Sequence, residues 1–284
     1  MDELPLEINQ CIRRYKPLEA DGLTLYPVLV REYEDFLLAR PALEVMHQSL
    51  PVAMMRIPLL SALYQMDFEA ISAGKPMVGL FSRAILGLAL SLRLGEGQSR
   101  EERKRRVQIV VDPQNPAKLT CLRFTDDNGE EHDITPVQYA KIRKIIAAQN
   151  GVKLESDDAN PDIVKAKKDM ANAKAVELNV NIDDLIFGVS SLMRVDETEI
   201  DEWPILKLDK SAKAYERVIN YIVCGISEGS GATYKGGNPY PHPFFERVSS
   251  GGGLFSQLGE TNKSGGVTPP ERVINAAAQT IQFP

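Results

Sequence analysis

Residues 107–134 have the sequence VQIVVDPQNPAKLTCLRFTDDNGEEHDI, and this stretch decides the fold class. Two runs of β-branched and apolar residues, at 107–111 and 119–124, enclose a turn rich in Pro and Asn. The sequence Asp-Asn-Gly at 127–129 favours a second tight turn, from which 131–134 returns as a third strand. The stretch therefore predicts a small antiparallel β-meander.

Apolar residues at helical spacing lie on both sides of this meander. Before it, Asp-Gly at 21–22 predicts a turn into a short strand, and three helices are expected near 30–38, 54–66 and 75–94. After it, Thr135-Pro136 predicts a capped helix. The helices expected in this half cover 135–150, 160–177, 181–194 and 207–224. We therefore expect an α+β protein that is mainly helical.

Composition divides the chain into four regions. Residues 1–98 form a strand-helix region, 99–134 the β-meander and 135–226 a helical region. Residues 227–284 form a tail rich in Gly, Ser and Pro, which is expected to be extended or disordered because it offers little apolar surface to bury. The mixed charges of 100–106 indicate a solvated connection before the first strand of the meander.

Charge and cysteine content exclude several classes of protein. The chain has 284 residues and a net charge of −6, which disfavours nucleic-acid binding. Cys11, Cys121 and Cys224 are far apart, as expected of free thiols in a reducing compartment. The amino terminus lacks the pattern of a signal peptide, and the apolar stretch 76–94 is interrupted by arginines and glycines. We expect neither export nor a membrane span.

No group of polar residues in the sequence has the spacing that catalysis or metal binding requires. His47, His132 and His242 lie in separate segments, and none has a Cys or His neighbour at ligand spacing. Ser190 and Cys224 have no nearby base that would activate them. The sequence therefore predicts no metal, no cofactor and no enzymatic activity.

Two segments are candidates for partner binding. Apolar residues occupy nearly the whole circumference of the helix within 76–94, and we propose Leu80, Phe81 and Leu88 as contacts to a partner. The equal alternative is a central helix buried in its own domain. In the tail, proline-spaced aromatic residues have no core of their own, and a docking role is expected for Tyr240, Phe244 and Phe245.

Several short patterns resemble a known group of proteins. They are Gly-Leu-Thr-Leu-Tyr-Pro at 22–27, Tyr-Glu-Asp-Phe-Leu at 33–37, elements of 133–150, Glu-Trp-Pro-Ile at 202–205 and Tyr-Glu-Arg-Val-Ile at 215–219. In these patterns the chain resembles tail-region proteins that phages and prophages of Gram-positive bacteria encode near the tape-measure protein. The resemblance covers residues 12–245 as scattered patterns, and it leaves the Gly-rich extension unmatched.

The resemblance implies a tail-assembly chaperone. Such a protein keeps the apolar tape-measure helix soluble in the host cytoplasm while tube subunits polymerise around it. The expected partners are accordingly the tape-measure protein or a tube subunit, together with a homo-oligomer of the chain, and neither nucleic acid nor a membrane is expected. The alternative is a structural virion component, a tail or connector subunit whose Gly-rich tail orders on assembly.

Overall fold

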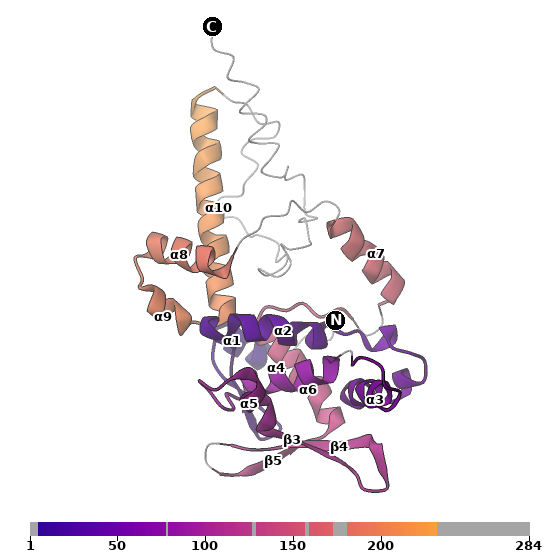
Figure 1. The fold of residues 1–284 in the computed structure, drawn as a ribbon. Helices are drawn as coiled ribbons and strands as arrows, with labels where there is room; N and C mark the ends of the chain where they lie inside the picture. The colour runs from indigo at the N-terminus through magenta and orange to yellow at the C-terminus, as the bar shows by residue number, and fades with distance from the viewer. Residues whose placement is uncertain (1–4, 78, 127–128, 157–158, 173–180, 232–284) are drawn as a thin grey trace. The chain divides into compact units, whose positions relative to one another are not determined.

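The computed structural model describes residues 5–77, 79–126, 129–156, 159–172 and 181–231 (Figure 1). The chain divides into two units. Unit 1 consists of Met1–Met170 and Asp201–Lys207, and unit 2 consists of Ala171–Ile200 and Leu208–Pro284. Helices dominate the described residues and two small antiparallel sheets accompany them, so the predicted α+β class is confirmed.

Unit 1 contains the sheets and most of the helices. Its helices are α1 (Leu6–Arg13), α2 (Tyr33–Glu44), α3 (Leu59–Ser72), α4 (Leu80–Ser91), α5 (Arg100–Arg105), α6 (Pro136–Gln149) and α7 (Pro161–Asn172), the last of which runs to the border of unit 2. Its strands are β1 (Leu18–Ala20), β2 (Leu23–Leu25), β3 (Val107–Asp112), β4 (Asn115–Thr125) and β5 (Glu131–Ile134). Short 3₁₀ turns occur at Val30–Glu32, His47–Ser49 and Met54–Arg56.

The predicted meander is present as a three-stranded sheet with the order β3-β4-β5 (Figure 1). Leu122 in the central strand pairs with Ile109 on one side and with Ile134 on the other. Leu122 and Ile134 are fully buried, because helices α3 and α6 pack against β4. The alternation of strand side chains thus directs one face of the sheet into the core of unit 1.

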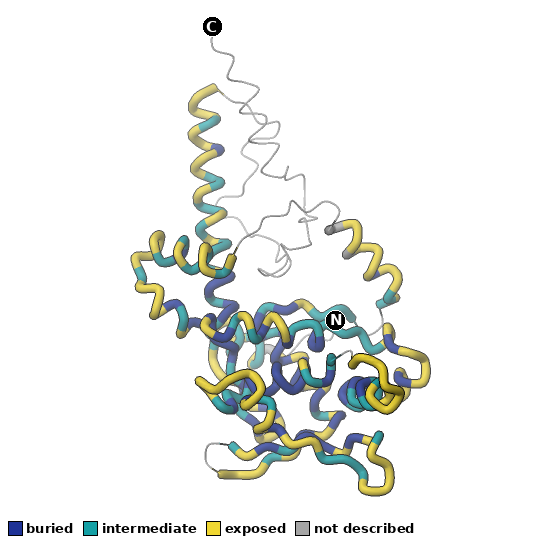
Figure 2. Tube along the Cα trace, in the orientation of Figure 1, coloured by how far each residue is buried: buried dark blue, intermediate teal, exposed yellow. Residues whose placement is uncertain are grey.

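Helix α4 lies at the centre of that core. It contacts α2, α3, α5 and α6, and its tube is dark blue for most of its length in Figure 2. Gly87 allows α4 and α2 to approach each other closely, since a Cβ atom at this position would lie 3.4 Å from the Cβ atom of Ala39 in α2. The buried Asp67 carboxylate in α3 accepts hydrogen bonds from the backbone N–H groups of Gly79 and Phe81, at 3.0 and 3.3 Å. It thereby satisfies donors that the first turn of a helix leaves without partners.

The charged run at 100–106 is mostly exposed and leads into β3, as its composition predicted, but it is helical and one of its arginines is buried. Ser99 forms a capping box with Glu102, and the run folds as helix α5. The Arg103 side chain is only 4% exposed and forms an ion pair with the nearly buried Glu32 at 2.7 Å. The burial of Arg103 was not predicted, because composition does not reveal that one arginine of a charged run points inward and pairs with a carboxylate there.

Helix α6 confirms the most secure of the sequence predictions. Thr135 caps it through a capping box with Gln138, and Pro136 occupies its first position. The buried Arg143 donates to the backbone carbonyls of Leu43 and Val45, at 2.7 and 2.6 Å. A cation at this place satisfies carbonyl groups at and just beyond the end of α2.

The described part of unit 2 is helical. They are α8 (Ile182–Met193) and the parts of α9 (Glu197–Asp201) and α10 (Ile205–Gly229) that lie within the unit. The helix predicted at 181–194 is present as α8, and the side chain of Asn181 caps its first turn. Because α10 continues to Gly229, the helical region extends a few residues beyond the predicted boundary at 226. From residue 232 onward, the predicted tail lies outside the described residues.

Candidate functional site

Helix α4, the predicted partner-binding helix, is buried within unit 1. The side chains of Phe81 and Leu88 are 5% and 0% exposed, and Leu80 is half-buried. These side chains are therefore not available to a partner, and the alternative prediction, a central helix covered by its own domain, holds instead. The reason is physical: an all-round apolar helix needs cover on every side, and α2, α3, α5 and α6 provide it. Tyr240, Phe244 and Phe245 lie outside the described residues.

Several residues that carry the resemblance meet around one segment of unit 1, Val28–Val30. Gln149 donates to the Leu25 carbonyl at 3.0 Å, and the Asn150 side-chain oxygen accepts from the Val28 N–H at 2.9 Å. The backbone of the 202–205 motif completes the set, with hydrogen bonds from Val30 N to Trp203 O and from Ile205 N to Val28 O. These patterns therefore hold distant parts of the chain together, which is a structural role.

An apolar groove lies between α8 and α10 in unit 2. It has a volume of about 310 Å³ and is lined chiefly by Leu185, Val189, Leu192, Tyr215 and Ile219. Gly188 also lines it, and a Cβ atom built there would meet no atom within 4 Å. The groove therefore has room for side chains that its own helices do not supply.

Large apolar side chains are also exposed on both helices of this groove. Phe187 is 65% exposed, and the yellow and teal tube along most of α8 and α10 in Figure 2 shows the same pattern. On α10 the exposed residues follow the helical period and form one stripe, Ile219, Ile222, Val223 and Ile226. We call the groove and this stripe together the unit 2 apolar face.

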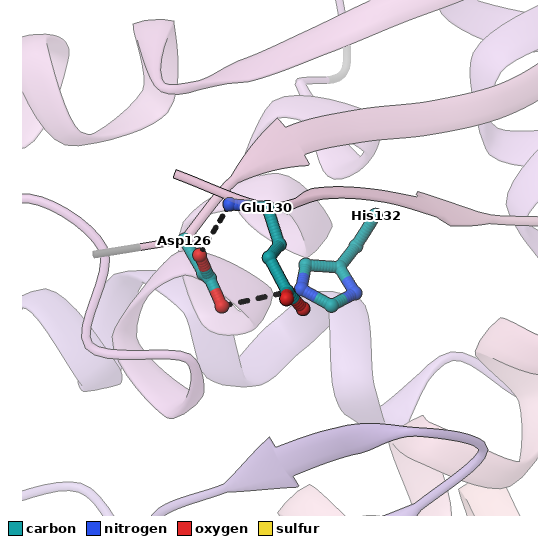
Figure 3. Close-up of side chains that lie close together, drawn as sticks. All are labelled: Asp126, Glu130 and His132. Atoms are coloured by element: carbon teal, nitrogen blue, oxygen red, sulfur yellow. Dashed lines mark hydrogen bonds and ion pairs between the residues drawn. The ribbon is translucent and has the colours of Figure 1, made fainter. Parts of the chain in front are cut away.

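A second cluster lies where β4 passes into β5 (Figure 3). The side chains of Asp126, Glu130 and His132 each offer one potential ligand atom, and these atoms lie within 4.8 Å of one another. Asp126 Oδ1 accepts a hydrogen bond from the Glu130 backbone N–H at 2.8 Å, and Asp126 Oδ2 lies 3.3 Å from His132 Nε2. The arrangement brings two carboxylates and an imidazole together at one end of the meander.

The opposite face of β5 differs in its electrostatics. Arg123 of β4 donates to both carboxylate oxygens of Asp133, at 2.7 and 2.8 Å. These hydrogen bonds and the attraction between the charges lower the pKa of Asp133 and raise that of Arg123. Burial, together with the nearby Asp133 carboxylate, raises the pKa of the Cys121 thiol, which disfavours its reactive thiolate form. This face therefore carries an ion pair whose two charges balance each other, next to a thiol of low reactivity.

The sequence did not predict the cluster of Asp126, Glu130 and His132. His132 was not predicted to be a ligand because only Cys and His neighbours were considered as co-ligands. The signal lay in the carboxylates, since a hairpin brings residue 126 back beside residue 132 and the strand alternation places 130 and 132 on one side. A search for Asp and Glu across the predicted turn could have found it.

No protein-family model, curated protein or solved structure matches the chain. Among the residues that the structure describes, no helix is both long enough and apolar enough to cross a membrane.

Proposed function

We propose that this chain is a non-enzymatic binding protein that holds an apolar helix of a phage tail component, in the manner of a tail-assembly chaperone. The single observation that carries the proposal is the unit 2 apolar face. The resemblance in sequence supplies the class of partner, and the tape-measure protein is the component whose chemistry fits best. The proposal moves the predicted binding surface from the buried α4 to α8 and α10.

The shape of the groove supports a helical ligand. Two helices that leave a trough between them can accept the apolar face of a third helix, whose side chains at successive turns fill the trough. Leu185 and Val189 lie one turn apart along α8, and Tyr215 and Ile219 lie one turn apart along α10. This spacing matches the repeat of side chains on an incoming helix.

The charge at the groove supports a particular kind of helix. Asp184 and Glu216 are exposed and both line the groove, so its polar margin includes two carboxylates. Electrostatic complementarity favours a partner that carries Lys or Arg beside its apolar stripe. The favoured occupant is therefore an amphipathic helix with basic flanks.

The exposed area also argues for a partner on energetic grounds. Each large apolar side chain that moves from water into a contact stabilises a complex by about 1.5–3 kcal/mol when it is fully buried. Phe187, Leu192, Ile222 and Ile226 are all about half exposed or more. Large apolar side chains that gather in the open on two helices are typical of a binding site.

The test fills the groove without disturbing the fold. We expect Gly188→Leu to abolish co-purification with the tape-measure protein encoded in the same genome, when the two proteins are co-expressed. Gly225→Leu is the matched control, because it is also a helical glycine with no atom within 4 Å of its Cβ position and it does not line the groove. Circular dichroism should show the same helix signal in both variants.

Two outcomes would contradict the proposal. Equal co-purification of both variants would show that the groove does not hold the tape-measure helix. A stoichiometric amount of this chain in purified virions would favour the structural virion component instead, because a chaperone leaves after assembly. Its absence from virions, together with loss of binding in Gly188→Leu only, is the result expected.

A further inference from the structure

The cluster of Asp126, Glu130 and His132 lies in unit 1 and plays no part in the proposed function. It is built from a short stretch of chain that turns back on itself. The pairing of Thr125 with Glu131 and the hydrogen bond from the Asp126 N–H to the Glu130 carbonyl fix the base of the turn. All three side chains are thus held close to the end of a regular ladder.

The electrostatics of the cluster leave negative charge unbalanced. Among the described residues, the Glu130 carboxylate accepts no hydrogen bond and forms no ion pair. It nevertheless lies beside the Asp126 carboxylate, and like charges at this separation repel. Arg123, the nearest arginine along β4, is paired with Asp133 on the opposite face of the sheet. A bound cation would offset the repulsion.

The imidazole is held in place but is not strongly engaged. The ring of His132 stacks on the buried ring of Phe124, its cross-strand partner, with centroids 5.3 Å apart and planes inclined by 24°. The 3.3 Å separation between His132 Nε2 and Asp126 Oδ2 is longer than an ordinary N–H···O hydrogen bond. The ring is therefore oriented by packing, and its Nε2 atom faces Asp126 Oδ2, the carboxylate oxygen with which it would share a bound ion.

We propose that Asp126, Glu130 and His132 bind a divalent transition-metal ion of the zinc class. One imidazole nitrogen with two carboxylate oxygens is a donor set that suits Zn²⁺ better than Ca²⁺ or Mg²⁺, which favour oxygen ligands alone. Bonds to zinc of about 2.0–2.2 Å require donor atoms within about 4 Å of one another. The present spread of 4.8 Å closes to that limit by small side-chain rotations.

The bound ion would cross-link the two ends of the β4–β5 turn. Its ligands come from both ends of the β4–β5 turn, so binding joins the end of β4 to the start of β5. Three protein ligands leave one position of a tetrahedral ion for water or for a donor from another molecule. Because the ion binds only the folded turn, zinc raises the stability of the folded chain.

The test is isothermal titration of the full chain with zinc chloride, together with thermal unfolding. We expect one ion per chain, and at least about tenfold weaker binding in both His132→Ala and Glu130→Gln. Glu131→Gln is the matched control, since it makes the same chemical change one residue away on the opposite face and leaves the affinity unchanged. Zinc should raise the unfolding temperature of the parent chain and of Glu131→Gln only.

Each of the following outcomes would contradict the proposed zinc site. Absence of stoichiometric binding excludes it directly. Equal affinity in the parent chain and His132→Ala places the zinc elsewhere, for example at His47 or Cys11. Binding of Ca²⁺ in preference to Zn²⁺ would show that the imidazole is not a ligand, and it would contradict the assignment to the zinc class.

Discussion

Two apolar regions of this chain have opposite surroundings. Helix α4 carries apolar residues around nearly its whole circumference, and four helices of unit 1 cover it. Helices α8 and α10 carry apolar residues in narrower patterns, and many of these side chains face solvent. Average apolarity does not separate the two regions, because α8 is as apolar as α4. What differs is how the apolar residues are distributed around the helix, since those of α8 are concentrated more on one side.

The difference is explained by what each pattern requires. A helix that is apolar on all sides can be covered completely only by several neighbours, and a chain of this size can supply them. A helix with one apolar stripe needs a single neighbour. If the chain supplies no such neighbour, a single partner helix is sufficient to cover the stripe. Partner-binding helices are therefore better sought among helices with one apolar stripe than among helices that are apolar on all sides.

A charged substitution in each region should give the largest difference in stability between the two regions. We expect Leu88→Asp to destabilise the chain by at least about 3 kcal/mol, because it places an unpaired charge among fully buried side chains. Ile219→Asp should change stability by less than about 1 kcal/mol, because that side chain is 45% exposed. Urea unfolding followed by circular dichroism measures both. Equal destabilisation of the two variants would contradict the comparison.

Sequence reasoning predicted the regular parts of the fold well. The meander, the Thr135 cap and most helices follow from local patterns that repeat every two or 3.6 residues. It did not predict contacts between residues far apart in the chain, such as the Arg103–Glu32 ion pair or the Arg143 bonds to the end of α2. These depend on which elements pack together, and local patterns do not carry that information.

The candidate sites were harder to predict for the same reason. The burial of Phe81 and Leu88 depends on neighbours that come from four other helices. The groove of unit 2 exists only because α8 and α10 lie beside one another. The cluster at His132 was within reach, since it arises inside one predicted hairpin. Geometry over short distances along the chain can be derived from sequence, whereas geometry over long distances needs the structure.

The second-largest expected change in stability concerns the start of α4. We expect Asp67→Ala to destabilise the chain by about 1–3 kcal/mol, because it leaves the buried N–H groups of Gly79 and Phe81 without their acceptors. Glu69→Ala is the control, since it removes the same charge from an exposed position of the same helix. Its effect should stay within about 0.5 kcal/mol. If the two variants unfold at the same urea concentration, the capping role of Asp67 is wrong.

Alkaline pH should weaken the core of unit 1 through Tyr139. Burial raises the pKa of Tyr139 from 10.0 to about 12, and among the described residues its hydroxyl has no hydrogen-bond partner. Between these two pH values the unfolded chain loses the proton and the folded chain keeps it. Stability contributed by this group is therefore complete below pH 10, and it falls by roughly 1 kcal/mol per pH unit between pH 10 and about 12.

The variant Tyr139→Phe isolates this effect from all other groups that titrate at high pH. It should be about as stable as the parent chain at neutral pH, because it removes a buried hydroxyl without a partner. The difference in unfolding free energy between the two chains should then grow in favour of Tyr139→Phe above pH 10. A constant difference across this range would mean that the hydroxyl reaches water.

The smallest expected effect compares one substitution in the two regions. Gly188→Ala in α8 places a methyl group where no atom lies within 4 Å, so it should stabilise the chain by about 0.5–1 kcal/mol through helix propensity alone. Gly87→Ala in α4 gains the same propensity, but its methyl group would lie 3.4 Å from the Cβ atom of Ala39. Crowding between α4 and α2 in the close-packed core offsets much of the gain there. Urea midpoints of the two variants should therefore differ, with Gly188→Ala the higher. The reverse order would show that α2 and α4 have room to spare and that the packing around α4 is looser than its burial indicates.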